Sequence, residues 1–421
     1  MRVNDILRST IIKNIMTLSV LQWFNYLFPL IMIPYLTRTL GPMNWGILSI
    51  IQSYVIYLNI LIEYGFTLSA TREVAKVRED KDRVAELIGS VLGGQLILVC
   101  LSILLTFFIW LLFPVFHRHP LLVTFGLLWS IAQSLNLIWL YQGLEKLQFI
   151  SIVDICFKVL VLISIFIFVK KPEDIEKVLL IQGMGSFATL AVTIFVTWRI
   201  YKFRLPSLGD CLVTLKLGWS MFLFRSAVSL YTVANVLILG VFASPAIVGY
   251  YAAAEKIAKA ITSLINPITS ALFPRFSYLV NQSREKAFKL AKISFIGIVS
   301  ASFILALIVF IFAPLIITSL LGSGFSDSIN ILRILCILIP VIAISNVLGI
   351  QWMIPLGLDN QFNKIILSAG IVNVLLAFLL TPKYLHFGMA YTVVVTELFV
   401  TGTIFLILKS RGLNPLIYKG E

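Results

Sequence analysis

The feature that most constrains this chain is a series of long apolar stretches that recurs from one end to the other. A helix that crosses a membrane needs about 20 mainly apolar residues. Twelve such stretches cover residues 14–36, 45–68, 88–114, 121–141, 149–169, 178–198, 218–242, 249–273, 293–321, 329–354, 365–381 and 386–408. Hydrophobic residues make up 59% and charged residues 12% of the 421 positions, against roughly 25% charged in soluble proteins. The sequence predicts an all-α integral membrane protein with about twelve transmembrane helices.

The polar segments between these stretches are too short to hold a soluble domain. The longest are loops of roughly 15–20 residues, whereas a domain needs about 50. The net charge of +14 therefore indicates basic cytoplasmic loops and an anionic lipid or ligand, and no nucleic acid. The first stretch exceeds the core of a signal peptide and lacks a small-residue cleavage site, so we expect an uncleaved span. The four cysteines are separated and form no CxxC motif, which indicates free thiols.

Motifs of nucleotide hydrolysis and of common hydrolases are absent from the sequence. It contains no GxxxxGK[ST], GxSxG or HExxH pattern, so neither a phosphate-binding loop nor a zinc-protease site is expected. The three histidines, His117, His119 and His386, fall at predicted outer boundaries. A metal site and a cofactor are therefore not expected, and the chain is interpreted as a protein other than an enzyme.

The distribution of lysine and arginine predicts the orientation of the chain. Positive residues are enriched in cytoplasmic loops of membrane proteins. Twenty-two lie in segments on the side of the N-terminus, and eight lie on the opposite side. Both termini are therefore expected in the cytoplasm.

A polar loop at residues 199–218 divides the twelve stretches into two sets of six. We expect an N-terminal lobe over residues 1–205 and a C-terminal lobe over residues 206–421, arranged around a central cavity. A faint repeat supports this division, because PMNWG at 42–46 is followed by PAIVG at 245–249, 203 positions later. Two halves of this kind are one recurring plan of transporters.

Basic residues inside the apolar stretches are candidate binding groups. A charge inside a membrane is costly, and it commonly faces the bundle interior or a water-filled cavity. Arg225 has no acidic residue in its own stretch, and a cavity-lining role is favoured over snorkelling towards the inner boundary. Lys158 follows Asp154 by four residues, so a structural pair competes with a binding role. The further candidates, which can also be interface anchors, are Arg38, Lys256, Lys259 and Arg333.

Two acidic residues, Glu63 and Glu397, lie within apolar stretches and are candidates to carry a coupling H+ or Na+. Glu397 can equally pair with a basic residue of another helix. A cationic cavity without a nucleotide site indicates an anionic cargo. A diphosphate suits arginine, whose planar fork binds phosphate oxygens in pairs.

Five segments in order along the chain resemble Wzx-type O-antigen flippases. They are NYLFPLIMIPYLTRTLGP at 25–42, EYGFTLSATREVA at 63–75, QGLEK at 142–146, GYYAAAEK at 249–256 with PRFS at 274–277, and IPLG at 354–357. These flippases form the polysaccharide-transport branch of the multidrug/oligosaccharidyl-lipid/polysaccharide exporter superfamily. The set is more specific than any one of its members.

This resemblance implies alternating access by two six-helix lobes in a bacterial inner membrane. The implied cargo is an undecaprenyl-diphosphate-linked sugar repeat unit that moves from the cytoplasmic to the periplasmic leaflet. Membrane lipid, a polysaccharide polymerase and chain-length proteins are the implied partners in lipopolysaccharide biosynthesis. The positions that match the family pattern are Arg38, Glu63, Arg72, Lys256 and Arg275.

Coupling or gating roles are expected for the acidic residues Glu63, Glu397 and Asp154 and for Arg72 and Arg275. Two other functions remain open at this point. The first is a cation-coupled multidrug exporter of the same superfamily, which the basic bias inside the bundle disfavours. The second is a membrane subunit of a polysaccharide synthase that transports nothing. The sugar composition of the cargo is not readable from the sequence.

Overall fold

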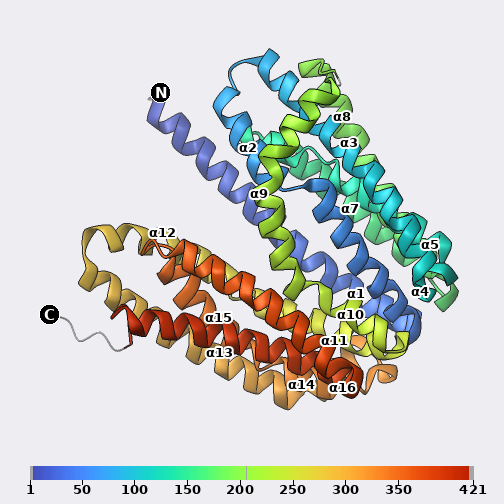
Figure 1. The fold of residues 1–421 in the computed structure, drawn as a ribbon, viewed down its shortest axis with the longest axis vertical. Coiled ribbons are helices and arrows are strands. Elements are labelled where there is room, and N and C mark those ends of the chain that lie inside the picture. The colour runs from blue at the N-terminus through green and yellow to red at the C-terminus, as the bar shows by residue number, and fades with distance from the viewer. Residues whose placement is uncertain (1–2, 205, 417–421) are drawn as a thin grey trace. The chain divides into compact units, whose positions relative to one another are not determined.

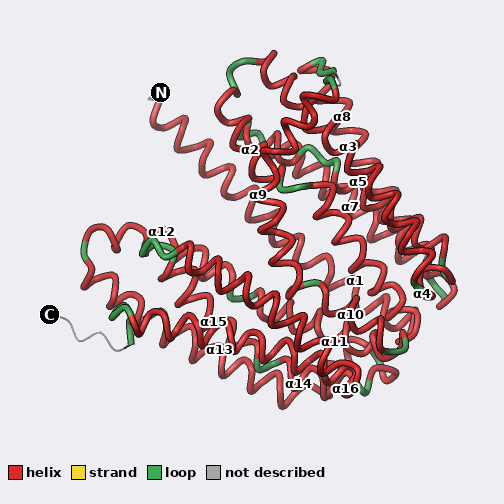
Figure 2. Tube along the Cα trace, in the orientation of Figure 1, coloured by secondary structure: helices red, strands yellow, loops and turns green. Residues whose placement is uncertain are grey.

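The computed structural model describes the backbone of residues 3–204 and 206–416, with side chains from residue 30 onward and that of Phe28. Within these ranges the chain consists mainly of helices joined by short loops, and it contains no strand (Figure 2). Nine of the described helical segments are long and apolar enough to cross a membrane. The prediction of an all-α membrane protein is therefore confirmed, whereas the count of twelve crossings and the division into two six-helix lobes stay predictions.

The helices group into two compact units, Met1–Ser226 and Ala227–Glu421, each of which is described by itself (Figure 1). The elements that begin in the first unit are α1 (Val3–Glu63), α2 (Phe66–Val77), α3 (Lys81–Leu112), α4 (Pro114–Arg118), α5 (Pro120–Ser134), α6 (Ile138–Gly143), α7 (Leu147–Phe168), η1 (Pro172–Asp174), α8 (Ile175–Tyr201) and α9 (Leu208–Thr232). Those of the second unit are α10 (Ala234–Phe242), α11 (Pro245–Ser263), α12 (Asn266–Gln282), α13 (Arg284–Leu321), η2 (Ser323–Phe325), α14 (Ser328–Leu335), α15 (Leu338–Ser345), the π-helix η3 (Asn346–Met353) and α16 (Asp359–Ser410).

Two of these helices contain two predicted spans each. In α1 the residue between the spans is Gly41, whose φ of 70° interrupts the helical geometry without unwinding the neighbouring turns. In α16 the corresponding residue is Leu385, with φ 49° and ψ −127°. A single residue with positive φ therefore stands at each of these two places where the sequence predicted a break between spans.

In the first unit, α5 packs extensively against α8 and α1, and α7 packs against both α8 and α1. A buried cluster of apolar side chains joins α2, α3, α6 and α7, with Trp139 at 2% exposure and Val74 and Ile88 fully buried. The opposite faces of α3 and α7 leave large apolar side chains such as Leu104, Phe107 and Leu160 exposed. Exposed apolar faces of this extent suit contact with lipid.

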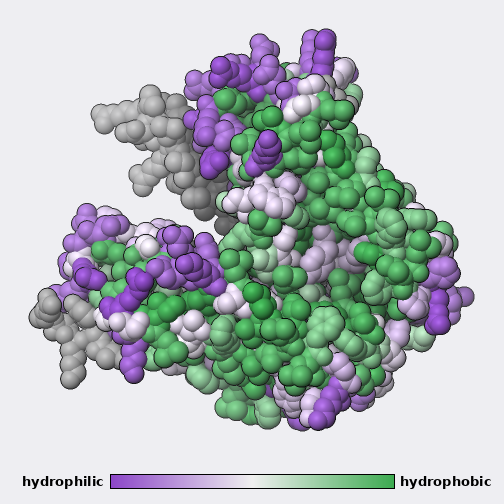
Figure 3. Space-filling model, viewed as in Figure 1, coloured by the Kyte–Doolittle hydropathy of each residue, from purple (hydrophilic) through white to green (hydrophobic). Residues whose placement is uncertain are grey.

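Hydropathy separates along the helices of each unit. On the face shown in Figure 3, hydrophobic residues cover the middle of each unit, and hydrophilic residues gather at the helix ends. In each unit the apolar stretches of the sequence thus form an apolar belt, and hydrophilic residues form the borders of this belt. This pattern is typical of a membrane protein.

A tight corner between α1 and α2 positions Glu63, the last residue of α1. Tyr64 and Gly65 both have positive φ, 47° and 77°, and these two residues separate the end of α1 from the start of α2. Helix α9 lies against this corner, because a Cβ added at Gly65 would come 2.5 Å from the Cβ of Met221. The ring of Tyr64 stacks on Phe222 of α9 at 4.7 Å between centroids. The corner therefore brings the last residue of α1, Glu63, to the side of α9.

In the second unit, α11 packs against α14, α10 against α16, and α13 against α15. Its apolar core includes Trp352, which is fully buried against Phe276 and Phe288. The Nε1 of Trp352 donates to the Leu413 carbonyl at 2.7 Å. The π-helix η3 carries this tryptophan, so the irregular turn belongs to a packed region of the unit.

Candidate functional site: a polar pocket in the first unit

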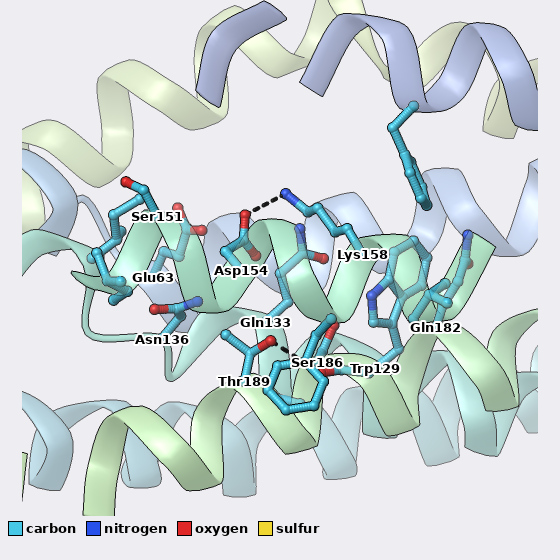
Figure 4. A pocket seen from close by; sticks show the side chains of 17 residues that line it. Glu63, Trp129, Gln133, Asn136, Ser151, Asp154, Lys158, Gln182, Ser186 and Thr189 are labelled. Atoms are coloured by element: carbon cyan, nitrogen blue, oxygen red, sulfur yellow. Dashed lines mark hydrogen bonds and ion pairs between the residues drawn. The ribbon is translucent and has the colours of Figure 1, made fainter. Parts of the chain in front are cut away.

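A pocket of about 240 Å³ lies among α1, α5, α7 and α8, within the first unit (Figure 4). Its walls combine aromatic rings, amides, hydroxyls and a small number of charges. The lining residues are Phe28, Glu63, Trp129, Ala132, Gln133, Asn136, Ile138, Ile150, Ser151, Asp154, Phe157, Lys158, Val161, Gln182, Gly185, Ser186 and Thr189. A polar pocket between membrane-length helices marks a place where a hydrophilic ligand can be accommodated.

Helical spacing explains why these polar side chains share one pocket. Residues three, four and seven positions apart lie on one face of a helix. The pocket residues of α7 are Ser151, Asp154 and Lys158, and those of α8 are Gln182, Ser186 and Thr189, so both sets follow this spacing. On α5, Trp129 and Gln133 are four apart, and Asn136 follows just beyond the end of the helix. The polar faces of α5, α7 and α8 thus meet at the pocket.

The sharpest sequence candidate, Arg225, has an acidic partner from another helix. Its Nη1 lies 2.6 Å from Oε2 of Glu63, across 162 residues of sequence. The two side chains are 36% and 26% exposed, so the pair is only partly shielded. The structure therefore brings together the predicted binding cation and a predicted coupling acid, and Glu63 also lines the pocket.

The second pair is formed within α7. Lys158 Nζ lies 2.7 Å from Oδ2 of Asp154, and Figure 4 shows this contact within the pocket. The structural pair that the spacing allowed is present, and it lies in the pocket wall. With Arg225 on Glu63, each charged group that lines the pocket has an opposite charge beside it.

Two amide oxygens at the pocket lack a hydrogen-bond partner in the described structure. They are Oε1 of Gln182, whose side chain is 5% exposed, and Oδ1 of Asn136. The Nε2 of Gln182 contacts only the sulfur of Met32, at 3.7 Å, among its described contacts. A buried acceptor without a donor costs about 1–3 kcal/mol, so these oxygens are ready to accept a bond from a ligand.

A hydrogen-bonded network holds the α5 wall of the pocket in place. Asn59 of α1 accepts from Ser130 at 2.7 Å and Ser134 at 3.1 Å, and it donates to Gln133 at 3.1 Å. Gln95 of α3 donates to the Ser134 carbonyl at 2.9 Å. Helices α1 and α3 therefore fix the rotation of α5 and, with it, the directions of Trp129 and Gln133. No group of three metal-ligating side chains occurs among the described residues.

The other predicted residues of the first unit lie away from this pocket. Arg38 is exposed on α1, four positions before the start of the PMNWG segment. Arg72 is exposed on α2, and its Nε lies 3.4 Å from Glu73. Neither residue contributes to the pocket wall.

The predicted residues of the second unit have separate surroundings. Lys259 donates to the Thr232 carbonyl at 2.8 Å and lies 3.1 Å from Glu255, while Lys256 is partly buried beside it on α11. Glu397 accepts from Ser345 at 3.1 Å. Two arginines stand over aromatic rings: Arg333 over Phe310 at 5.4 Å and Arg275 over Tyr278 at 5.7 Å. These contacts are typical of side chains anchored on their own unit.

The sequence reasoning identified the charges of the pocket and missed its neutral residues. Trp129, Gln133, Asn136, Gln182, Ser186 and Thr189 lie in apolar stretches and carry no charge. The available signal was the helical spacing of amides and hydroxyls within otherwise apolar helices. An amide or hydroxyl side chain costs less free energy to place in a membrane than a charged side chain does. Hydropathy alone therefore does not distinguish a helix face that binds a ligand from one that packs on another helix.

Two solved structures are similar to this chain in fold. The chain is similar to the lipid II flippase MurJ in an inward closed conformation, with a TM-score of 0.71, 15% identity, and coverage of 94% of this chain and 87% of MurJ. It is also similar to an inward-facing multidrug resistance MATE family transporter, with a TM-score of 0.70, 14% identity, and coverage of 91% and 94%. At these identities the likeness establishes the fold.

Two relatives share a higher sequence identity with this chain than these two structures do. The chain is 33% identical over 412 residues to a "Putative O-antigen transporter" of Escherichia coli (strain K12), covering 95% of this chain and 97% of the relative. It is 31% identical over 398 residues to a protein of the same description from Shigella dysenteriae, covering 92% and 97%. The resemblance inferred from the five ordered segments is thereby confirmed. The family model described as "Polysaccharide biosynthesis protein" matches residues 11–280, and the chain belongs to this family.

Proposed function

We propose that this protein is a flippase that moves lipid-linked polysaccharide repeat units across a bacterial inner membrane. The full-length match to relatives described as O-antigen transporters carries the proposal. The fold of a lipid II flippase and a polar pocket inside membrane-length helices support it. The cargo would be an undecaprenyl-diphosphate-linked repeat unit that moves from the cytoplasmic to the periplasmic leaflet.

The proposed step is alternating access without chemistry on the cargo, so the protein would be a transporter and not an enzyme. The cations proposed to hold the diphosphate are Arg225, Arg38, Lys158, Lys256, Lys259 and Arg333. The contact of 2.6 Å between Arg225 and Glu63 bears on how a diphosphate would bind this arginine. A diphosphate that binds Arg225 competes with Glu63, because Nη1 of the guanidinium already contacts Oε2 of Glu63.

This exchange gives Glu63 a proposed gating role. With the cargo absent, Glu63 neutralises Arg225 and lowers the cost of a charge in the membrane. With the diphosphate bound, Glu63 is released next to an anion, and the repulsion between the two negative groups favours the entry of a cation. A coupling H+ can enter at this point, and Na+ is the alternative coupling ion. Glu397, Asp154, Arg72 and Arg275 remain proposed coupling or gating residues.

The proposed setting is the bacterial inner membrane with both termini in the cytoplasm. Membrane lipid surrounds the apolar belt, and the polysaccharide polymerase and chain-length proteins act on the periplasmic side after transport. A cation-coupled multidrug exporter remains the alternative activity. The two acids that line the pocket are each beside a cation at 2.6 and 2.7 Å, which disfavours a binding site for cationic drugs.

Deletion and complementation in the bacterium that carries this gene test the proposal. Loss of the protein is expected to remove surface polysaccharide and to accumulate the lipid-linked repeat unit in the inner membrane. The wild-type gene is expected to restore export, whereas Arg225→Lys, which keeps the charge but loses the planar fork, restores it poorly. Normal polysaccharide in the deletion strain, together with increased sensitivity to cationic drugs, would favour the multidrug exporter.

A further inference from the structure

We propose that one end of the pocket in the first unit is a subsite for a single uncharged sugar ring, with Trp129 as its stacking face. The inference rests on the proposed function, because the sugar would be part of the lipid-linked cargo. It assigns binding residues that carry no charge and that lie on α5 and α8.

The pairing of charges determines which class of ligand the pocket favours. Phosphate would meet the carboxylates of Glu63 and Asp154, and an organic cation would meet Lys158 and Arg225. Both pairs are already closed, at 2.6 and 2.7 Å. The diphosphate proposed to bind Arg225 opens the pair with Glu63, and a second charged group in the pocket would have to open the Asp154 pair as well. A neutral ligand with many hydroxyl groups leaves both pairs intact and can donate to their outer oxygens.

The neutral residues of the pocket match the two surfaces of a sugar ring. A pyranose has an apolar face of C–H groups and a rim of hydroxyls that donate and accept hydrogen bonds. Trp129 is partly buried and offers a flat apolar face with an N–H donor. The pocket walls also carry amide and hydroxyl groups, which both donate and accept. These groups belong to Gln133, Asn136, Ser151, Gln182, Ser186 and Thr189.

Gln182 supplies a second and independent observation. Its side chain is 5% exposed, it lines the pocket, and its Oε1 has no hydrogen-bond donor within the described structure. At the other end of the pocket, Asn136 also has an unpartnered oxygen, Oδ1. A sugar hydroxyl is a donor of the right size for such an acceptor. The pocket volume of about 240 Å³ lies below the roughly 300–1,000 Å³ of sites for drug-sized ligands, which suits one ring.

The pocket has two ends with different chemistry. In Figure 4, Trp129 and Gln182 lie towards one end, whereas Glu63 and Asn136 lie towards the other. The backbones of α5 and α8 approach closely at the first end, because a Cβ added at Gly183 would lie 3.6 Å from the Cβ of Trp129. The end at Glu63 is also the end of the Arg225 pair. A diphosphate on Arg225 and the sugar attached to it would therefore occupy neighbouring parts of one unit.

Binding measurements with two lipids separate this subsite from a diphosphate site. The purified full-length chain in nanodiscs is titrated with the undecaprenyl-diphosphate-linked repeat unit of its own bacterium and with undecaprenyl diphosphate, which has no sugar. Trp129→Leu and Gln182→Leu are each expected to weaken the sugar-bearing lipid by about tenfold and to change the sugar-free lipid less than twofold. Trp129→Phe keeps an aromatic face and is expected to retain most of the affinity.

Two control substitutions lie on α8 outside the pocket. Met184→Leu alters a 63% exposed side chain of α8, and Trp198→Leu removes a 51% exposed tryptophan of that helix. Both are expected to bind the two lipids like the wild type. Equal losses for both lipids in the Trp129 and Gln182 variants would overturn the subsite, as would equal wild-type affinity for the two lipids. Failure of the wild type to bind either lipid would contradict the proposed function itself.

A protection experiment tests the subsite where a variant does not fold. Ser186→Cys is made in a chain whose four native cysteines are replaced by serine, and its alkylation rate is measured. The repeat-unit lipid is expected to slow alkylation at least fivefold, and undecaprenyl diphosphate or tetraphenylphosphonium to slow it less than twofold. Protection by tetraphenylphosphonium would assign the pocket to a cation. Equal alkylation with and without the repeat-unit lipid would contradict occupation of the pocket by a sugar.

Discussion

The surroundings of Arg225 depend on a residue that is distant in the sequence. Its own stretch of sequence contains no acid, and its partner Glu63 stands 162 residues earlier. The pair forms because the α1–α2 corner and α9 pack together through Tyr64 and Phe222. An arginine that would otherwise need water or lipid headgroups is thus accommodated within the bundle.

A double-mutant cycle on Arg225 and Glu63 measures how strongly the pair is coupled. An exposed pair contributes about 0.2–1 kcal/mol, whereas loss of one partner from a buried pair costs about 3–5 kcal/mol. For this partly shielded pair we expect Glu63→Gln and Arg225→Gln each to lower the free energy of unfolding by about 1–3 kcal/mol. The double variant is expected to lose less than the sum. Reversible unfolding in detergent is the measurement, and strict additivity would contradict a direct pair.

The residues of the pocket were predictable from the sequence to different degrees. Lys158 and Asp154 follow helical spacing, so their contact at 2.7 Å could be anticipated. The partner of Arg225 could not, because it depends on tertiary packing. Trp129 and Gln182 were missed because a single aromatic or amide residue in an apolar helix can equally serve in packing against a neighbouring helix. Only the convergence of three helices shows that these side chains face one pocket.

At the scale of elements, the corner between α1 and α2 is the part that the site depends on most. Gly65 has φ 77°, which costs an L-residue roughly 1–2 kcal/mol. A Cβ at this position would also come 2.5 Å from Met221 Cβ. The corner therefore requires glycine for both conformation and space.

Gly65→Ala is accordingly expected to lower thermal stability and to weaken transport, because α9 has to move away from Glu63. Gly297→Ala in α13 is the matched control, since a Cβ there meets nothing within 4 Å and alanine favours helix. This control is expected to be as stable as the wild type or slightly more stable. The midpoint of thermal unfolding checks both variants. An unchanged midpoint in Gly65→Ala would show that the corner can relax at no cost.

The helices themselves were largely predictable, because a run of 20 apolar residues in a membrane has few alternatives to a helix. The break predicted at residues 37–44 is present as a kink at Gly41, whose φ of 70° and ψ of 173° are non-helical and divide α1 into two helical parts. The predicted span at 249–273 is divided between α11 and α12. Hydropathy records the total length of apolar chain, whereas such interruptions depend on individual backbone angles.

At the scale of the whole molecule, the orientation in the membrane follows from the positive residues and is directly testable. In a chain free of its native cysteines, Lys202→Cys is expected to react with a membrane-impermeant thiol reagent only after the inner membrane is opened. Glu173→Cys is expected to react in intact spheroplasts. Both side chains are exposed in the structure. The reverse pattern would place the termini in the periplasm and contradict the direction proposed for transport.

Movement of a lipid-linked repeat unit between leaflets is the property that defines the proposed function. The full-length protein is reconstituted into liposomes with undecaprenyl-diphosphate-linked oligosaccharide, and the fraction accessible to an added sugar-cleaving enzyme is followed with time. Protein-dependent exposure of the cargo in the inner leaflet is expected, with a rate at least tenfold lower for Arg225→Lys than for the wild type. An unchanged inner-leaflet pool, both with and without an imposed H+ or Na+ gradient, would contradict a flippase.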